Sequence, residues 1–263
     1  MPNNLKDLSQ AGVSIWLDDL SRDRLQSGSL AKLIEGSSVV GVTTNPSIFS
    51  AAIKGSALYR EDILALKKAG KSTAEVVSDL TTKDVKDACD LFLPVFKHTS
   101  GVDGRVSIEV DPFFAHETQK TIDQGKELWN IVNRPNLLIK VPATLEGLPA
   151  IEELTASGIS VNVTLIFSVE RYEKVMDAYL RGLERRVAAG QAVSEIHSVA
   201  SFFVSRIDGE IDKRLDAKGL NSPLRGKIAV ANAHLAYEAF LKMTGSDRWK
   251  KLAAAGAKLQ RPL

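Results

Sequence analysis

The amino-acid sequence predicts an α/β protein built as a parallel barrel of the (β/α)8, or TIM, type. Strand-like apolar runs alternate with helical stretches six times along the 263 residues, a pattern typical of a parallel sheet with helices outside it. The length also fits the about 250 residues that one such barrel needs. The main rival, a dinucleotide-binding fold, needs a glycine-rich turn after its first strand. The turn at residues 19–22 contains no glycine, so the barrel is the better prediction.

Six strands and the beginning of a seventh are expected from apolar runs that stop at proline, aspartate or a helix cap. The runs are 14–19, 39–46, 105–110, 137–142, 158–167 and 197–206, with the seventh beginning at 259–263. The helical stretches between them are 21–36, 59–68, 73–80, 84–96, 116–132, 148–156, 169–189, a short helix ending at 215, 229–242 and 248–255. Ser21 and Ser168 are the expected amino-terminal caps of two of these helices.

The strand count predicts one α/β-barrel domain over residues 1–263 that is incomplete at its carboxyl end. Eight strands are needed to close such a barrel, so the last one to two β/α units should be missing. The first and sixth strands would then be unpaired edges. A second polypeptide piece that supplies the last strands is therefore expected as a partner.

Composition excludes several classes of protein. The chain is 44% hydrophobic and 25% charged, with a net charge of +2 and no basic block, which argues against a nucleic-acid or membrane partner. No apolar run reaches the length of a membrane span, and no signal peptide is visible. The single cysteine, Cys89, fits a reducing cytoplasm. The four histidines lack metal-ligand spacing, so no metal site is expected.

Lys140 is the residue on which the functional prediction depends. It follows Leu137-Leu138-Ile139 and precedes Val141-Pro142, in a run that reads as a strand buried on both faces. Burial disfavours the charged form of a lysine, and the free amine is the form that makes a Schiff base. The alternative is a lysine whose stem packs while its ammonium reaches water.

Polar residues recur at the carboxyl end of each predicted strand, where barrels of this kind carry their chemistry. They are Asp18, Asn45, Glu109, Lys140, Asn162 with Thr164, and Ser201 with Arg206. Each has a structural alternative: a helix cap for Asp18, a turn for Asn45, an ion pair with Arg105 for Glu109, an ordinary strand position for Thr164, and a cap or surface ion pair for Arg206. The recurrence at one end of six strands favours an active site.

Four segments resemble transaldolases. They are Thr-Thr-Asn-Pro-Ser at 43–47, Ile-Glu-Val-Asp at 108–111, Leu-Ile-Lys-Val-Pro-Ala-Thr at 138–144 and Asn-Val-Thr-Leu-Ile-Phe-Ser at 162–168. The resemblance runs from about residue 14 to the end. It implies a class I aldolase of the pentose phosphate pathway that needs no cofactor. Such an enzyme moves a dihydroxyacetone unit from sedoheptulose 7-phosphate to glyceraldehyde 3-phosphate, giving erythrose 4-phosphate and fructose 6-phosphate.

The resemblance also implies a role for each residue. Lys140 would form the imine and Asp18 would be the acid and base of carbon–carbon cleavage, with Asp19 as its competitor because strand alternation lets only one point inward. Glu109 and Thr164 would hold the water that moves protons during imine formation. Three polar side chains would bind sugar hydroxyls and Arg206 the phosphate: Asn45, Asn162 and Ser201.

Two other functions stay open at this stage. One is an aldolase of the same architecture that cleaves fructose 6-phosphate and releases free dihydroxyacetone, which would turn over without an acceptor. The other is a non-catalytic, sugar-phosphate-binding barrel fragment. A substituted lysine or carboxylate would have favoured the fragment, but both residues are present.

Overall fold

The computed structural model describes residues 4–263, and its seven strands form a sheet whose order follows the sequence. The pairs β1–β2, β2–β3, β5–β6 and β6–β7 are parallel. The strands are β1 (Ile15–Leu17), β2 (Val39–Val42), β3 (Arg105–Glu109), β4 (Leu137–Pro142), β5 (Val161–Ile166), β6 (Ser198–Phe202) and β7 (Gln260–Pro262). The predicted alternation of parallel strands with helices is confirmed.

The chain divides into two compact units, and the division falls inside β4 between Ile139 and Lys140. The amino-terminal unit holds residues up to 112 together with 124–139, and the carboxy-terminal unit holds 113–123 together with 140–263. Two elements, η2 (Pro112–Phe114) and α7 (Thr118–Val132), contribute residues to both units.

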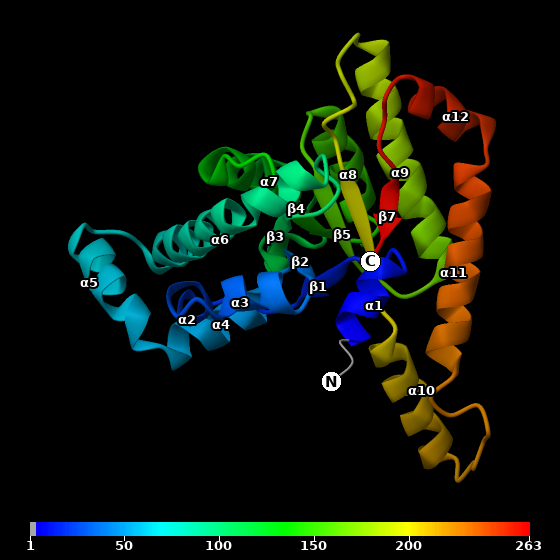
Figure 1. The fold of residues 1–263 in the computed structure, drawn as a ribbon, viewed down its shortest axis with the longest axis horizontal. Coiled ribbons are helices and arrows are strands. Elements are labelled where there is room, and N and C mark those ends of the chain that lie inside the picture. The colour runs from blue at the N-terminus through cyan, green and yellow to red at the C-terminus, as the bar shows by residue number, and fades with distance from the viewer. Residues whose placement is uncertain (1–3) are drawn as a thin grey trace. The chain divides into compact units, whose positions relative to one another are not determined.

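The helices of the amino-terminal unit are coloured blue to cyan in Figure 1. They are α1 (Asn4–Gln10), α2 (Arg22–Gln26), α3 (Ser29–Gly36), α4 (Pro46–Gly55), the 3₁₀ turn η1 (Ala57–Tyr59), α5 (Arg60–Lys68) and α6 (Thr73–His98). Ser21 caps α2, as predicted, by accepting a hydrogen bond from the Arg24 amide. Tyr59, Val76 and Leu80 form a buried cluster that joins η1 to α6.

Two helix predictions in this unit are wrong. The single helix expected over 21–36 is two helices, because Gly28 adopts a φ of 72° and separates α2 from α3. The two helices expected over 73–80 and 84–96 are one, α6. The polar residues between them do not break it, because the hydroxyls of Thr81 and Thr82 donate to backbone carbonyls one turn earlier in the helix.

The strand expected over 39–46 is also shorter than predicted. It ends at Val42, and Asn45 already caps α4 with Pro46 in the first helical turn. Proline is well suited to that position because its missing N–H is one that a helix start leaves unbonded.

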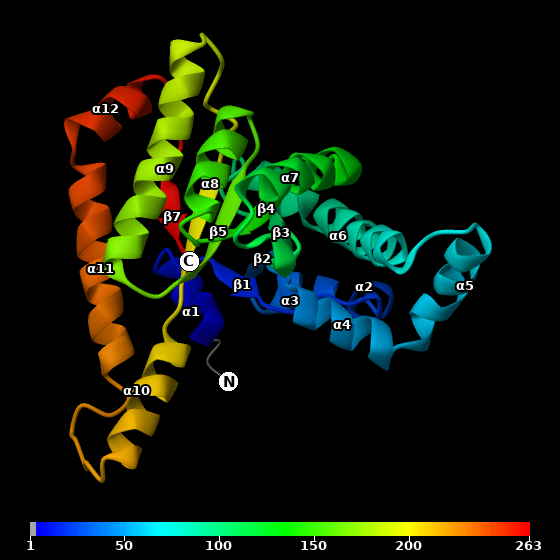
Figure 2. The same cartoon turned by 180° about the vertical axis from the view of Figure 1, so that it is seen from behind.

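Three helices of the carboxy-terminal unit, α8, α11 and α12, pack against α9, as Figures 1 and 2 show, and α10 packs against α11. They are α8 (Gly147–Ala156), α9 (Val169–Ala188), α10 (Ser205–Ala217), α11 (Ile228–Thr244) and α12 (Asp247–Ala254). Ser168 caps α9 as predicted. A buried cluster joins α9 to α12 through Tyr179, Leu183, Trp249 and Leu252.

The strand β6 has a neighbour on each side, which corrects the expectation that it would be an unpaired edge. It pairs with β5 and also with β7, whose Gln260 lies opposite Ser198. The predicted seventh strand is therefore present and bonded. The expected strand over 197–206 ends at Phe202, so Arg206 lies in the first turn of α10 rather than in the strand.

The close packing of α8 on α9 depends on Gly182, and its replacement by alanine is expected to destabilise the protein. A Cβ at this position would lie 2.5 Å from Thr155 Cβ and 2.7 Å from the Glu152 carbonyl oxygen. Overpacking of this kind lowers the free energy of unfolding by about 1–3 kcal/mol, which urea denaturation would measure.

Gly209 provides the matched control. It lies inside α10, and a Cβ there would have no neighbour within 4 Å. Gly209→Ala should therefore raise stability by about 0.5–1 kcal/mol, the usual gain over glycine inside a helix. A Gly182→Ala protein as stable as the wild type would show that α8 and α9 do not pack as closely as the structure has them.

Candidate functional site

In the amino-terminal unit, strand register places Asp18 and Glu109 on one face. Leu17 pairs with Val42, and Val42 pairs with Val106, so the next residues, Asp18, Thr43 and Ser107, share a row. Residues paired in parallel strands face the same side, and so do residues two apart in one strand. Glu109 therefore follows on the face that carries Asp18, whereas Asn45 lies beyond the end of β2, at the start of α4.

Asp18 and Asp19 differ in what surrounds their carboxylates. The carboxylate of Asp19 accepts a hydrogen bond of 2.6 Å from Arg24 Nε and forms an ion pair with that guanidinium. Asp18 is exposed and has no side-chain partner among the described residues. Both residues line an open cavity of about 400 Å³, together with Ser21, Asp23 and residues of α4. An unpaired carboxylate at a cavity is the one able to exchange a proton with a ligand, which favours Asp18.

Asn45 has a structural role, but as a helix cap and not as the turn residue that was its alternative. Its Oδ1 accepts a hydrogen bond of 3.0 Å from the Ile48 amide and so caps α4. The cap fixes the side chain and leaves the Nδ2 donors of Asn45 for another group.

Glu109 ends β3 and is only partly buried. Arg105, four residues earlier, donates from Nε and from one terminal nitrogen to the Gly101 carbonyl oxygen and lies over the Phe96 ring, 5.1 Å from its centroid. These contacts hold the Arg105 side chain at the opposite end of the strand from Glu109. The guanidinium of Arg105 is therefore engaged at the start of β3, whereas Glu109 stands at its end.

In the carboxy-terminal unit, Lys140 is buried in β4 with 6% of its surface exposed. It is the only buried lysine in the part of the chain that the structure describes. The Ala143 amide donates to the Thr164 carbonyl oxygen at 2.8 Å, and this bond sets a register in which Lys140 lies opposite Asn162. The two side chains therefore face the same side.

Asn162 and Thr164 of β5 are fully or almost fully buried. Ser201 Oγ donates to Asn162 Oδ1 at 2.9 Å, which joins β6 to β5 through two of the predicted residues. Lys140 and Asn162 thus share a row, and Ser201, two residues beyond the Val199 that pairs with Asn162, lies on the same face.

A bulge follows this row in β5. The pairing with β6 shifts between Val163 and Ile166, and Leu165 takes a φ of 60°, which is unfavourable for a residue with a branched side chain. Leu165 is exposed there and lines a cavity of about 460 Å³ with Thr144, Phe167 and Arg171. Bulges often lie beside active sites, where they change the direction of side chains.

Arg206 is exposed on α10, with its guanidinium 4.7 Å from the centre of the Phe203 ring. Within the described residues no carboxylate forms an ion pair with it. The alternative of a surface ion pair is therefore wrong for Arg206, and its guanidinium is available to an anionic group such as a phosphate.

Two polar features of the amino-terminal unit were missed by sequence reasoning. Thr43 has a buried hydroxyl oxygen without a partner in the structure, in the same row as Asp18. Arg22, at the start of α2, is buried against Asp84 of α6. The signal for Asp84 is its place in the apolar stripe of α6, one turn after Leu80 and one before Ala88.

The described residues lack two further kinds of feature. In residues 4–263 no group of three or more histidine, cysteine, aspartate or glutamate side chains could hold a metal ion. No helix in that range combines the length and the apolar character needed to cross a membrane.

Comparison with known proteins decides the family. Residues 15–261 match the family described as Transaldolase/Fructose-6-phosphate aldolase. The chain belongs to this family. Proteins named Transaldolase share 60% identity over 262 residues in Mycolicibacterium smegmatis and 56% over 261 residues in Saccharopolyspora erythraea. Each match covers 99% of this chain and 71% of the relative.

A transaldolase from Mycobacterium bovis is 59% identical over 263 residues, which cover 70% of that protein. Membership confirms the predicted family and, with the parallel sheet, the fold class of a TIM-type barrel. None of these comparisons supports the second polypeptide piece that the strand count led us to expect.

Proposed function

We propose that this chain catalyses the transaldolase reaction, in which sedoheptulose 7-phosphate and glyceraldehyde 3-phosphate give erythrose 4-phosphate and fructose 6-phosphate. The observation that carries the proposal is Lys140, a buried lysine in a row with Asn162, whose side chain accepts a hydrogen bond from Ser201. Relatives named Transaldolase, which are 54–60% identical along nearly the whole chain, favour this function over the two alternatives.

In the proposed mechanism the amine of Lys140 attacks the ketone carbon of the donor, and loss of water gives a protonated imine. Asp18 takes the proton from the hydroxyl on the second carbon beyond the ketone carbon, so that the bond between the first and second of these carbons can break. The carbon–carbon bond then breaks, its electron pair moves toward the imine nitrogen, and the aldose phosphate leaves. The remaining enamine attacks the carbonyl carbon of the acceptor, whose oxygen receives the proton from Asp18.

The other residues bind and orient in this proposal. Glu109 and Thr164 hold the water that carries protons during imine formation and hydrolysis. Asn45, Asn162 and Ser201 bind sugar hydroxyls, and the unpaired guanidinium of Arg206 binds the phosphate. No cofactor or metal takes part. The buried free thiol of Cys89 suits a reducing compartment, so we place the enzyme in the cytoplasm. We also treat residues 1–263 as one barrel domain.

Trapping and turnover together test the proposal. Sodium borohydride added with fructose 6-phosphate should reduce the imine and place the sugar-derived mass on the peptide that contains Lys140. Steady turnover of the donor should require an added aldose phosphate. Free dihydroxyacetone released without an acceptor would instead identify the aldolase alternative, and the absence of any adduct would leave only the binding fragment.

A further inference from the structure

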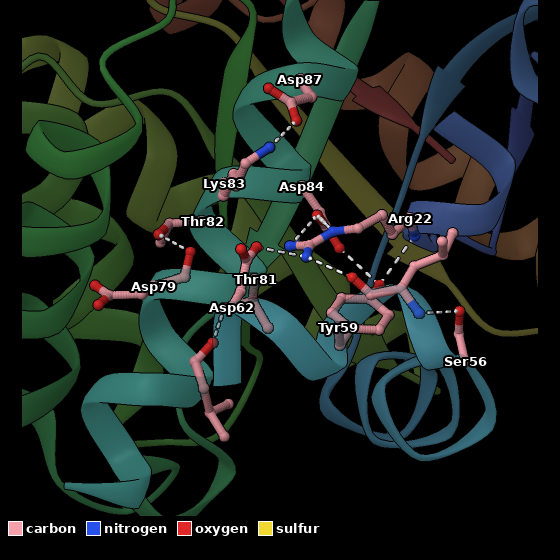
Figure 3. Close-up of polar contacts among 12 residues, drawn as sticks. Arg22, Ser56, Tyr59, Asp62, Asp79, Thr81, Thr82, Lys83, Asp84 and Asp87 are labelled. Carbon is pink, nitrogen blue, oxygen red and sulfur yellow. Dashed lines mark hydrogen bonds and ion pairs between the residues drawn. The ribbon is translucent and has the colours of Figure 1, made fainter. Parts of the chain in front are cut away.

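A buried polar network holds the start of α2, and the proposed mechanism assigns it no role. Figure 3 shows Arg22 at its centre. Arg22 is 4% exposed and its Nε donates to Asp84 Oδ1 at 3.0 Å. One terminal nitrogen donates to Asp62 Oδ2 at 2.6 Å and to the Leu58 carbonyl oxygen at 3.2 Å. A single guanidinium thus links α2 to η1, α5 and α6.

Tyr59 extends this network to the backbone of α2. Its hydroxyl donates to Asp84 Oδ2 at 2.6 Å and accepts a hydrogen bond of 2.9 Å from the Arg22 amide. Its ring lies 4.4 Å from the Arg22 guanidinium carbon. Burial raises the pKa of Tyr59, and the hydrogen bond to Asp84 raises it further, so the hydroxyl keeps its proton and can donate.

Stability alone is a weak reason for such an arrangement. A buried ion pair costs desolvation of both charges, and apolar residues of similar size often serve the stability of a protein as well or better. Asp84 is fully buried, and burial raises its pKa in spite of the hydrogen bonds and the positive charge that it receives. The network gives a fixed geometry instead, because directed hydrogen bonds reach both the side chain and the backbone of Arg22.

That geometry bears on Asp18, four residues before Arg22. At one end of the connecting segment Leu17 is paired with β2, and at the other the Arg22 amide is bonded to Tyr59. Leu20 between them is fully buried. On its other side the segment lines the open cavity of about 400 Å³, which gives no support. The contacts of Leu20 and Arg22 therefore fix the path of the backbone after Asp18.

We propose that Arg22, Tyr59 and Asp84 are positioning residues for the Asp18 carboxylate. The inference rests on the proposed function, because it takes Asp18 to be the acid and base of carbon–carbon cleavage. A displacement of about 1 Å in a catalytic group is enough to reduce turnover by up to about 10²-fold. The network has no assigned part in imine formation at Lys140, so that step should be spared when the network is weakened.

The test uses Tyr59→Phe, which keeps the ring and removes the hydroxyl from both of its hydrogen bonds. We expect the single-turnover rate of carbon–carbon cleavage to fall about 10-fold, while the amount of borohydride-trapped adduct on Lys140 and the KM for the donor stay at wild-type values. Asp62→Asn weakens the ion pair between the Arg22 guanidinium and the half-exposed side chain of residue 62. It should cause a smaller loss of the same kind, and it serves if Tyr59→Phe does not fold.

Val76→Ala is the control for a general loss of stability, since Val76 packs in the same buried cluster as Tyr59 and makes no side-chain hydrogen bond. It should lower the melting temperature without changing the ratio of cleavage rate to trapped adduct. A double-mutant cycle gives the decisive comparison. If Tyr59 acts through Asp18, then Tyr59→Phe should cause no further loss of cleavage rate in an Asp18→Asn background.

Each result separates the two proposals. Losses that multiply in the double variant, or a Tyr59→Phe protein that changes no more than Val76→Ala, would overturn the positioning role while the wild-type adduct stands. Failure of the wild-type protein to form an adduct with fructose 6-phosphate would refute the proposed function itself.

Discussion

Lys140→Arg is expected to abolish both the borohydride-trapped adduct and transaldolase turnover. A guanidinium stays protonated in proteins and has no free amine to attack a ketone. The loss should therefore reach the detection limit, and it should affect imine formation rather than binding. Intact mass after reduction in the presence of fructose 6-phosphate measures the first effect, and a coupled assay of aldose phosphate transfer measures the second.

Lys174→Arg is the matched control for Lys140→Arg. Lys174 is exposed on α9 and forms an ion pair with Glu170 one turn away, which arginine can also form. This variant should retain the adduct and full turnover. Circular dichroism should show that Lys140→Arg is folded, because the larger side chain enters a buried strand. An adduct of undiminished yield on the Lys140→Arg protein would place the Schiff base on another lysine.

The lysine strand could be predicted from the sequence because its signal is local. A continuous apolar run closed by a proline defines both of its ends, and β4 has the predicted bounds. The row that joins Lys140 to Asn162 depends on sheet register. Their strands were nevertheless expected to be neighbours, because consecutive strands of a parallel barrel lie side by side. The fold and the buried position of Lys140 therefore followed from short segments.

What could not be predicted depends on contacts between distant residues. Arg22 and Asp84 are 62 positions apart, and nothing near Arg22 in the sequence shows that a carboxylate on α6 will receive it. The continuity of α6 also escaped prediction, because the hydroxyls of Thr81 and Thr82 bond within the helix across the gap between the two predicted helices. The bulge at Leu165 likewise could not be predicted, because no glycine stands there to indicate a positive φ.

The choice between Asp18 and Asp19 shows how one contact can favour one side of an ambiguity of register. Strand alternation alone lets either residue face the sheet's polar side. The ion pair of Asp19 with Arg24 turns that carboxylate toward α2, and Asp18 is left exposed at the cavity. The sequence contained both aspartates and the arginine, but only the placement of α2 shows which pair forms.

Asp18→Asn should stop the reaction after the imine has formed. The carboxamide can hold a hydrogen bond but cannot take the hydroxyl proton, so cleavage loses its base while Lys140 still reacts with the donor. A loss of roughly 10²-fold or more in turnover is the usual effect of removing a general base. Mixing the variant with fructose 6-phosphate, without reductant, should therefore let the covalent intermediate accumulate, and denaturing mass spectrometry would detect it.

Asp19→Asn is the comparison that tests the choice of residue. This change weakens the ion pair with Arg24 at a partly exposed site, where such pairs contribute little to stability, and it leaves the Asp18 carboxylate in place. Turnover should stay within a few-fold of the wild type, with no accumulated intermediate. Because the two aspartates are adjacent, any general disturbance of the β1–α2 connection should affect both variants alike. A protein in which Asp19→Asn stalls after imine formation while Asp18→Asn turns over normally would reverse the assignment, and would mean that the Asp19–Arg24 pair opens during the reaction.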